Sequence, residues 1–131
     1  MSLISIVDED DHIIEYVERS ERRPDQRYRV AALWMTNSRG DILIAQRHRS
    51  KKHNPLLWWP VAAGTVEMDE SYLENIIKET EEEIGITWIS PIPGPKTQMT
   101  SWYLHFVQWF TLVIDLPIEA FILQADEVEW V

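Results

Sequence analysis

The stretch GTVEMDESYLENIIKETEEEIGI, residues 64–86, decides the fold of this chain. Its second half has helical periodicity and predicts a helix over residues 70–84. Gly85 follows the last predicted turn, at the position where a left-handed helix cap favours glycine. Strands are predicted on both sides of this helix, so the expected class is α+β with a mixed β-sheet.

The predicted helix carries an apolar stripe beside an acidic arc. At about 100° per residue, the stripe contains Leu73, Ile76, Ile77, Thr80 and Ile84. Glu79, Glu82 and Glu83 fall on the neighbouring arc because their spacing is i, i+3 and i+4. Three carboxylates this close repel one another, and a hard divalent cation such as Mg²⁺ would relieve the repulsion.

The segment before the helix makes the acidic arc more than a solvated surface. Acidic helix faces are common, and a run of glutamates alone indicates solvent exposure. Here the small residues Ala62, Ala63 and Gly64 precede the helix, so backbone carbonyls can approach a ligand without a large side chain between them. The sequence therefore predicts a loop with accessible carbonyls next to three aligned carboxylates.

Residues 64–86 resemble the Nudix box. That family pattern is Gly, five residues, Glu, seven residues, Arg-Glu, an apolar residue, any residue, Glu-Glu, any residue, Gly and an apolar residue. The glycines and glutamates match at every spacing, whereas Lys78 replaces the arginine and Thr80 the apolar residue. The resemblance implies one Nudix domain over residues 1–131, an α/β/α sandwich with a mixed sheet. Because members usually continue into a second helix, we expect the C-terminal helix to be short or missing.

The resemblance also implies a site and a reaction. A divalent cation, Mg²⁺ or Mn²⁺, is expected to bind Glu79, Glu82, Glu83 and the main-chain carbonyl of Ala63. Gly64, Glu70 and Lys78 would support these ligands, and Lys78 can pair with Glu74 or Glu82 one turn away. The implied reaction is hydrolysis of a diphosphate linkage in a nucleoside diphosphate derivative, in which Glu79 or Glu127 takes the proton of the attacking water.

Three further residues are candidates for substrate binding. Arg47 and Lys51 belong to a basic segment before the box and could contact phosphate, although solvated loop charges are the simpler interpretation. Trp58 could stack on a nucleobase or a prenyl chain, or could belong to the core.

The remaining elements are expected as strands around the helix. LISIV (3–7) and IIEYV (13–17) predict a hairpin around the polar turn 8–12, and YRVAALWMT (28–36) with ILIAQRH predicts a second one. The prolines at 91, 93 and 95 are expected to break the chain. One long strand is expected over 98–114 and a short one over 119–123.

Composition excludes several classes of protein. The formal net charge of -10 argues against duplex nucleic acid or an anionic membrane as partner. The chain has no cysteine, so disulfides, zinc–thiolate sites and cysteine nucleophiles are excluded. We expect a cytoplasmic enzyme acting on a small-molecule diphosphate, with a homodimer as one compatible assembly.

Two alternatives stay open at this stage. The first is a non-catalytic binding protein with the same fold, which the replacement of arginine by Lys78 would accommodate. The second is a prenyl-diphosphate enzyme, because IVDEDDHIIEYVER, YRVAALWMTNSRGDILIAQRHRSKKHNP and WWPVAAGTVEMDES resemble the isopentenyl-diphosphate-isomerase-like branch of the family. Isomerases of that branch need a cysteine and a histidine-rich metal site. This chain lacks the cysteine and has Thr65 where a histidine often follows the box glycine.

Overall fold

The computed structural model describes residues 2–47, 58–60, 62–87, 89–100, 103–115 and 128–130, with backbone alone at 44–47, 58–60 and 128–130. The strands are β1 (Leu3–Val7), β2 (Ile13–Glu18), β3 (Arg27–Thr36), β4 (Ile42–Arg47), β5 (Trp58–Pro60), β6 (Ala62–Thr65), β7 (Ile92–Met99), β8 (His105–Val113) and β9 (Val128–Trp130). The helices are the short 3₁₀ turn η1 (Arg19–Glu21) and the α-helix α1 (Tyr72–Ile84). No helix among these residues is long and apolar enough to cross a membrane.

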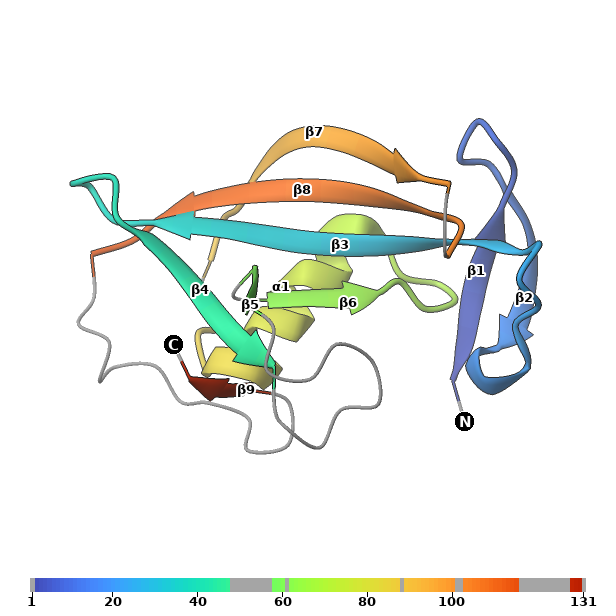
Figure 1. The fold of residues 1–131 in the computed structure, drawn as a ribbon, viewed down its shortest axis with the longest axis horizontal. Helices are drawn as coiled ribbons and strands as arrows, with labels where there is room; N and C mark the ends of the chain where they lie inside the picture. The colour runs from blue at the N-terminus through green and yellow to red at the C-terminus, as the bar shows by residue number, and fades with distance from the viewer. Residues whose placement is uncertain are drawn as a thin grey trace.

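Strand β3 is the centre of the sheet (Figure 1). It pairs antiparallel with β1, β4 and β6, and parallel with β8 along nine residues from Tyr28↔His105 to Thr36↔Val113. Strand β8 continues to β7, whereas β4 continues to β5 and β9. The two predicted hairpins, β1–β2 and β3–β4, are confirmed. The predicted class, α+β with a mixed sheet, is confirmed as well.

The main core lies between α1 and one face of the sheet. Alternate residues of β3, namely Ala31, Leu33 and Met35, are at most 1% exposed because side chains of a strand alternate between its two faces. They form one cluster whose other members are Ala62, Val66, Ile76, Ile84, Ile86 and Phe110. Burial of each large aliphatic side chain stabilises the fold by about 1.5–3 kcal/mol. The core therefore fixes α1 against β3 and β6.

Both ends of α1 follow from its sequence. The Ser71 side chain accepts a hydrogen bond from the Glu74 backbone N–H, and the Glu74 carboxylate accepts one from the Ser71 N–H. This reciprocal capping box starts the helix. Gly85 ends the helix with φ 75°, a conformation that costs glycine little, so the predicted cap is confirmed.

The predicted apolar stripe is partly wrong. Ile76, Thr80 and Ile84 are fully buried, and the Thr80 hydroxyl donates to the Ile76 carbonyl at 2.6 Å, which satisfies the hydroxyl. Leu73, however, is 43% exposed, and Asn75 is buried in the first turn. The buried face turns toward Asn75 because its amide has partners there, as described below.

The predicted single strand over 98–114 is also wrong, because this region contains a hairpin of β7 and β8. The prolines at 93 and 95 lie within β7 instead of breaking it. Among the described strands β7 pairs with β8 alone, and its register shifts between Pro93 and Lys96. An edge strand with a bulge tolerates proline, since the missing N–H is not needed by a second neighbour. The strand expected over 119–123 lies outside the described residues.

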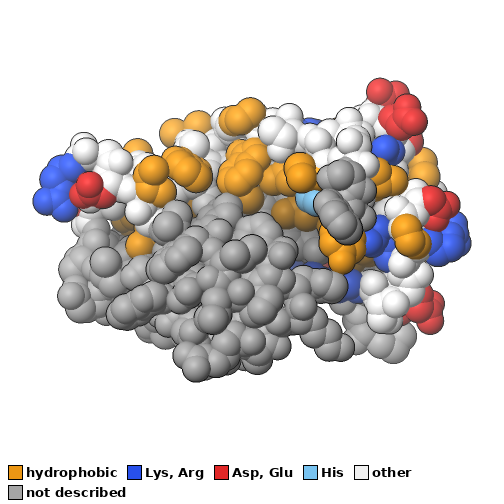
Figure 2. Space-filling model, viewed as in Figure 1, with side chains coloured by type: hydrophobic (Ala, Val, Ile, Leu, Met, Phe, Trp, Pro, Cys, Tyr) orange, Lys and Arg blue, Asp and Glu red, His pale blue; other side chains and the backbone are white. Residues whose placement is uncertain are grey.

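Hydrophobic and charged side chains occupy different parts of the surface. Figure 2 shows hydrophobic side chains over the long strands, where Ile92 and Val113 are more than 60% exposed. Charged side chains of both signs gather at the end formed by the β1–β2 hairpin in the same view.

Candidate functional site

Gly64 brings the strand before the helix into contact with a glutamate of α1. A Cβ atom on Gly64 would lie 2.5 Å from both Cγ and Cδ of Glu79. Because real Cβ atoms do not approach this closely, only glycine leaves room for the Glu79 side chain here. Gly64 pairs with Ala31 in the middle of β6, so the contact is held by the sheet. The structure therefore brings Gly64 and Glu79 of the predicted site together.

The Glu79 carboxylate lies in an environment that disfavours its negative charge. Burial, and after it the charge of Glu82, raises the pKa of Glu79 to about 7. Lys78 and Arg19 act in the opposite direction without compensating. A divalent cation beside these oxygens would supply the missing positive charge, and carboxylate and carbonyl oxygens are the donors that Mg²⁺ prefers. The donors are thus of the chemical kind that a hard cation binds.

Glu82 and Glu83 extend the acidic arc toward solvent. Glu82 is exposed and Glu83 is half-buried, one turn after Glu79. Their ligand atoms do not gather with those of Glu79 within 4.8 Å. Among the described side chains, the group of three that does so is Asp8, Asp10 and His12.

That second group lies in the exposed turn between β1 and β2 and is explained by the turn. The Asp8 carboxylate accepts hydrogen bonds from the backbone N–H groups of His12 at 3.0 Å and Asp10 at 2.8 Å. The hydrogen bond from His12 is the main reason why the pKa of Asp8 is lowered. Aspartate commonly stabilises turns in this way. The turn geometry alone therefore accounts for the proximity of these three side chains.

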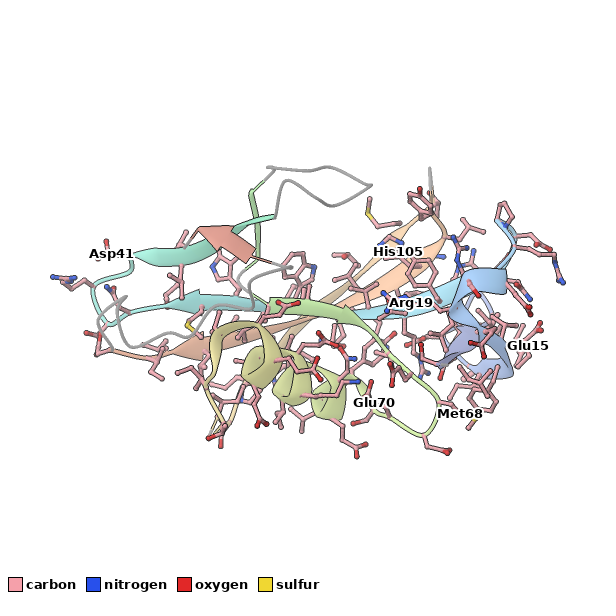
Figure 3. All side chains as sticks on the ribbon, turned by 90° about the horizontal axis from the view of Figure 1, so that it is seen from below. Glu15, Arg19, Asp41, Met68, Glu70 and His105 are labelled. Atoms are coloured by element: carbon pink, nitrogen blue, oxygen red, sulfur yellow. The ribbon has the colours of Figure 1, made fainter. Side chains whose placement is uncertain are left out.

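Glu70 supports the site through a network beneath the helix. One of its oxygens accepts from the Asn75 amide at 2.8 Å and from the Glu67 N–H at 3.1 Å. The other lies 2.8 Å from Nζ of Lys78. Burial would raise the pKa of Glu70, but these bonds, with Lys78 first, lower it. Glu70 is therefore held as a carboxylate at the start of α1 (Figure 3).

The predicted ion pair of Lys78 with a glutamate one turn away is wrong. Instead of Glu74 or Glu82, Lys78 contacts Glu70 at 2.8 Å and Glu67 at 3.5 Å. Glu74 is engaged in the capping box, and the loop before the helix folds back toward Lys78. The lysine that replaces the arginine of the family pattern thus forms an ion pair with Glu70.

Asn75 is a residue of the site that sequence reasoning missed. Its side-chain amide donates to the Thr65 carbonyl at 3.0 Å as well as to Glu70, and the residue is fully buried. It therefore ties the last residue of β6 to the helix. The sequence signal that could have identified Asn75 is its place as a polar residue next to the apolar stripe, five positions after Glu70.

Comparisons with known proteins agree with this geometry. Residues 25–131 match the NUDIX domain family. The chain belongs to the Nudix family. A Nudix hydrolase of Salmonella typhi, YfcD, is 30% identical over 129 residues, which cover 95% of this chain and 67% of that protein. YfcD of Escherichia coli K12 is 29% identical over 129 residues, covering 95% of this chain and 69% of its own length. The predicted enzyme class, a Nudix hydrolase acting on diphosphate bonds, is confirmed.

Solved structures agree on the fold. DR0079 from Deinococcus radiodurans has a TM-score of 0.84 at 22% identity, covering 98% of this chain and 80% of that one. A MutT protein from Methanosarcina mazei has a TM-score of 0.67 at 20% identity, covering 80% and 75%. The Nudix box of this chain therefore lies in the fold that its spacing predicts.

The remaining predicted residues lie partly outside the described structure. Arg47 ends β4, where its backbone pairs with Val128, and Trp58 begins β5 opposite Gln46. Only the backbone is described at both positions. Lys51 and Glu127 lie outside the described residues, so the roles of all four stay predictions.

Proposed function

We propose that this chain hydrolyses a diphosphate linkage in a nucleoside diphosphate derivative, with water attacking phosphorus. The observation that carries the proposal is the Glu79 carboxylate, which packs against the bare Cα of Gly64 and whose pKa is raised to about 7, first of all by burial. A buried carboxylate at this position of a Nudix box is best explained by a cation that binds it.

The proposed cation is Mg²⁺ or Mn²⁺. The residues that would hold it are Glu79, Glu82, Glu83 and, through its main-chain carbonyl, Ala63, the residue before Gly64 in β6. A divalent cation held there would neutralise phosphate charge and make the attacking water more acidic. Glu70 and Lys78 act through the positions of the ligands, because their ion pair and the Asn75 amide fix the loop that joins β6 to α1.

The proton of the water passes to a carboxylate. We favour Glu79, because it is held against β6 beside the proposed ligand Ala63, and keep Glu127 as the competing base. Arg47 and Lys51 are proposed to contact substrate phosphate, and Trp58 the group attached to it.

We propose that the resemblance to the isopentenyl-diphosphate-isomerase-like branch reflects common ancestry and not a common activity. Isomerisation is not proposed, because the chain has no cysteine. Thr65 stands where, in that branch, a histidine often follows the box glycine. Its hydroxyl accepts a hydrogen bond from Arg19 at 3.0 Å. A threonine engaged in this way does not replace a metal-binding imidazole.

A substrate panel tests the reaction. Nucleoside diphosphate sugars, dinucleoside polyphosphates and a prenyl diphosphate are incubated with the protein and Mg²⁺ or Mn²⁺ in oxygen-18 water. We expect metal-dependent release of a phosphate product that carries the heavy oxygen. Isomerised prenyl diphosphate, heavy oxygen bonded to carbon, or tight binding without turnover of any substrate would contradict the proposal.

A further inference from the structure

Strand β2 forms one edge of the sheet and has an open side. Among the described strands it pairs with β1 alone, and the β1–β2 hairpin lies at one end of the molecule (Figure 1). Residues 13–16 of this strand are all exposed, and the large aliphatic side chain of Ile14 is 60% exposed. The free backbone groups of such an edge can pair with another chain. An edge strand with exposed apolar side chains is therefore a candidate for pairing with a partner.

The backbone of Tyr16 faces this open side. Just beyond the end of the strand pair, the Arg19 N–H donates to the Ser2 carbonyl at 3.1 Å. Hydrogen-bonded pairs alternate with pairs that are not hydrogen-bonded along an antiparallel ladder, so the pair of Tyr16 with Ser5 is of the second kind. The Ser5 N–H agrees with this assignment, because it donates to the Val66 carbonyl on the other side of β1. The N–H and C=O of Tyr16 thus point away from β1, where a further strand would pair.

A hollow of about 500 Å³ lies along the same edge. Tyr16 and Glu18 line it from β2, and Glu21 and Gln26 line it from the segment that follows the strand. Gln26 is 4% exposed and its amide donates to Glu15 of β2 at 3.3 Å, so this segment is held against the strand before a partner binds. The described residues that line the hollow all belong to the first 26 of the chain, outside the Nudix box. The hollow is therefore a surface separate from the proposed cation site.

The charge of the hollow is negative. Three carboxylates line it, those of Glu15, Glu18 and Glu21. Arg23 also lines it, but its Nε pairs with Asp25 at 3.2 Å. A second copy of this chain would bring the same glutamates to the same edge, and charged side chains on edge strands commonly prevent self-pairing in this way. A partner with positive side chains meets attraction instead, so the hollow fits a basic segment better than a second copy.

We propose that the open edge of β2 binds an extended, positively charged segment of another protein as an added strand. The Tyr16 N–H and C=O would hydrogen-bond to the backbone of that segment, and its basic side chains would meet Glu18 and Glu21. Backbone bonds supply affinity in strand addition, and side-chain contacts supply specificity. The six residues of β2 span about 20 Å, so a partner segment of similar length covers the edge. The inference is independent of the reaction proposed for the Nudix box.

Three synthetic peptides test the added strand. Acetyl-KVKVKVK-amide is the basic probe, acetyl-EVEVEVE-amide reverses its charge, and acetyl-KVKPKVK-amide keeps the charge but lacks an N–H in the middle of the strand. Hydrogen exchange of the backbone amides is followed by NMR at about 1 mM peptide, a concentration that detects weak binding. We expect the basic peptide to slow exchange at Tyr16 and not at Val17, whose N–H already faces β1. The acidic and proline peptides should protect neither amide.

Charge variants of the protein test the role of the hollow. Glu18→Lys/Glu21→Lys should bind the basic peptide more weakly, on the order of tenfold, because two attractive contacts become repulsive. Glu9→Lys/Glu81→Lys is the matched control, since it changes net charge equally at two exposed glutamates outside the hollow, and it should bind like wild type.

Four results would overturn the proposal. The first is an unchanged Tyr16 exchange rate in wild type with the basic peptide, and the second is equal protection by the acidic or the proline peptide. The third is equal affinity of the two double variants when both show native circular dichroism. The fourth is protection of Tyr16 that rises with protein concentration in the absence of peptide, which would assign the edge to a second copy of the chain.

Discussion

Asp11 offers the strongest test of how the N-terminal hairpin is attached to the rest of the fold. Its side chain is 8% exposed and its backbone has φ 63°, which is unusual for a residue other than glycine. The carboxylate accepts from Arg29 Nε at 2.8 Å, Lys96 Nζ at 2.6 Å and the Tyr72 hydroxyl at 2.9 Å. One side chain thus joins the β1–β2 turn to β3, β7 and the start of α1.

We predict that Asp11→Asn lowers the free energy of unfolding by about 3 kcal/mol, the lower end of the cost of removing one partner of a buried ion pair. Asparagine tolerates the positive φ, so the backbone is not strained further. The loss comes mainly from Arg29, which is 15% exposed and would face a neutral amide. Lys96 is 39% exposed and can turn to solvent, so its share is small.

Urea unfolding followed by circular dichroism measures this change. The expected loss corresponds to a melting temperature lower by about 10 °C for a domain of this size. Asp10→Asn is the control, because Asp10 is exposed in the same turn and the substitution removes the same charge. A loss below about 1 kcal/mol for Asp11→Asn, or an equal loss for Asp10→Asn, would show that the buried network does not hold the hairpin.

Three further predictions concern the box and the pH dependence of stability. Gly64→Ala should fold, since the end of the Glu79 side chain can move. Its turnover should fall about 10–100-fold, because the Glu79 carboxylate is displaced. Full activity in a steady-state assay would show that the contact between Gly64 and Glu79 does not position this carboxylate. Lys78→Arg should keep turnover within about tenfold, or 1.4 kcal/mol of barrier, because arginine can make the same pair with Glu70; a larger loss in a folded variant would give lysine a role of its own. The lowered pKa of Asp11 means that its carboxylate stabilises the fold above the unfolded value near 3.8 and that this contribution disappears as pH falls through the folded value. Urea unfolding between pH 6 and pH 3 should therefore show wild type losing stability toward acid more steeply than Asp11→Asn, and parallel curves would contradict this.

The parts of the site that the sequence predicts are those set by spacing along one helix. The i, i+3, i+4 spacing of the box glutamates and the cap at Gly85 depend on helical geometry alone, so they could be identified without a structure. The bond from the Thr80 hydroxyl to the Ile76 carbonyl is of the same local kind.

What the sequence could not predict depends on chain segments that meet in space. The partner of Lys78 is set by the loop that folds back over the helix, and helical spacing therefore indicated the wrong glutamates. Asp11 is one of four acids in a row, and only its contact with β3, β7 and α1 distinguishes it. Prolines are compatible with β7 because its described neighbour is β8 alone, a property of sheet order that local sequence does not contain.

Metal binding by the box glutamates is the claim on which the proposed reaction depends most directly. Mg²⁺ and Mn²⁺ are titrated by calorimetry into wild type, Glu82→Gln and Glu81→Gln, the last being an exposed neighbour on another side of α1. We predict that Glu81→Gln binds like wild type and that Glu82→Gln binds at least about tenfold more weakly, a difference of 1.4 kcal/mol. Equal affinity of wild type and Glu82→Gln for both cations would contradict the assignment of the site.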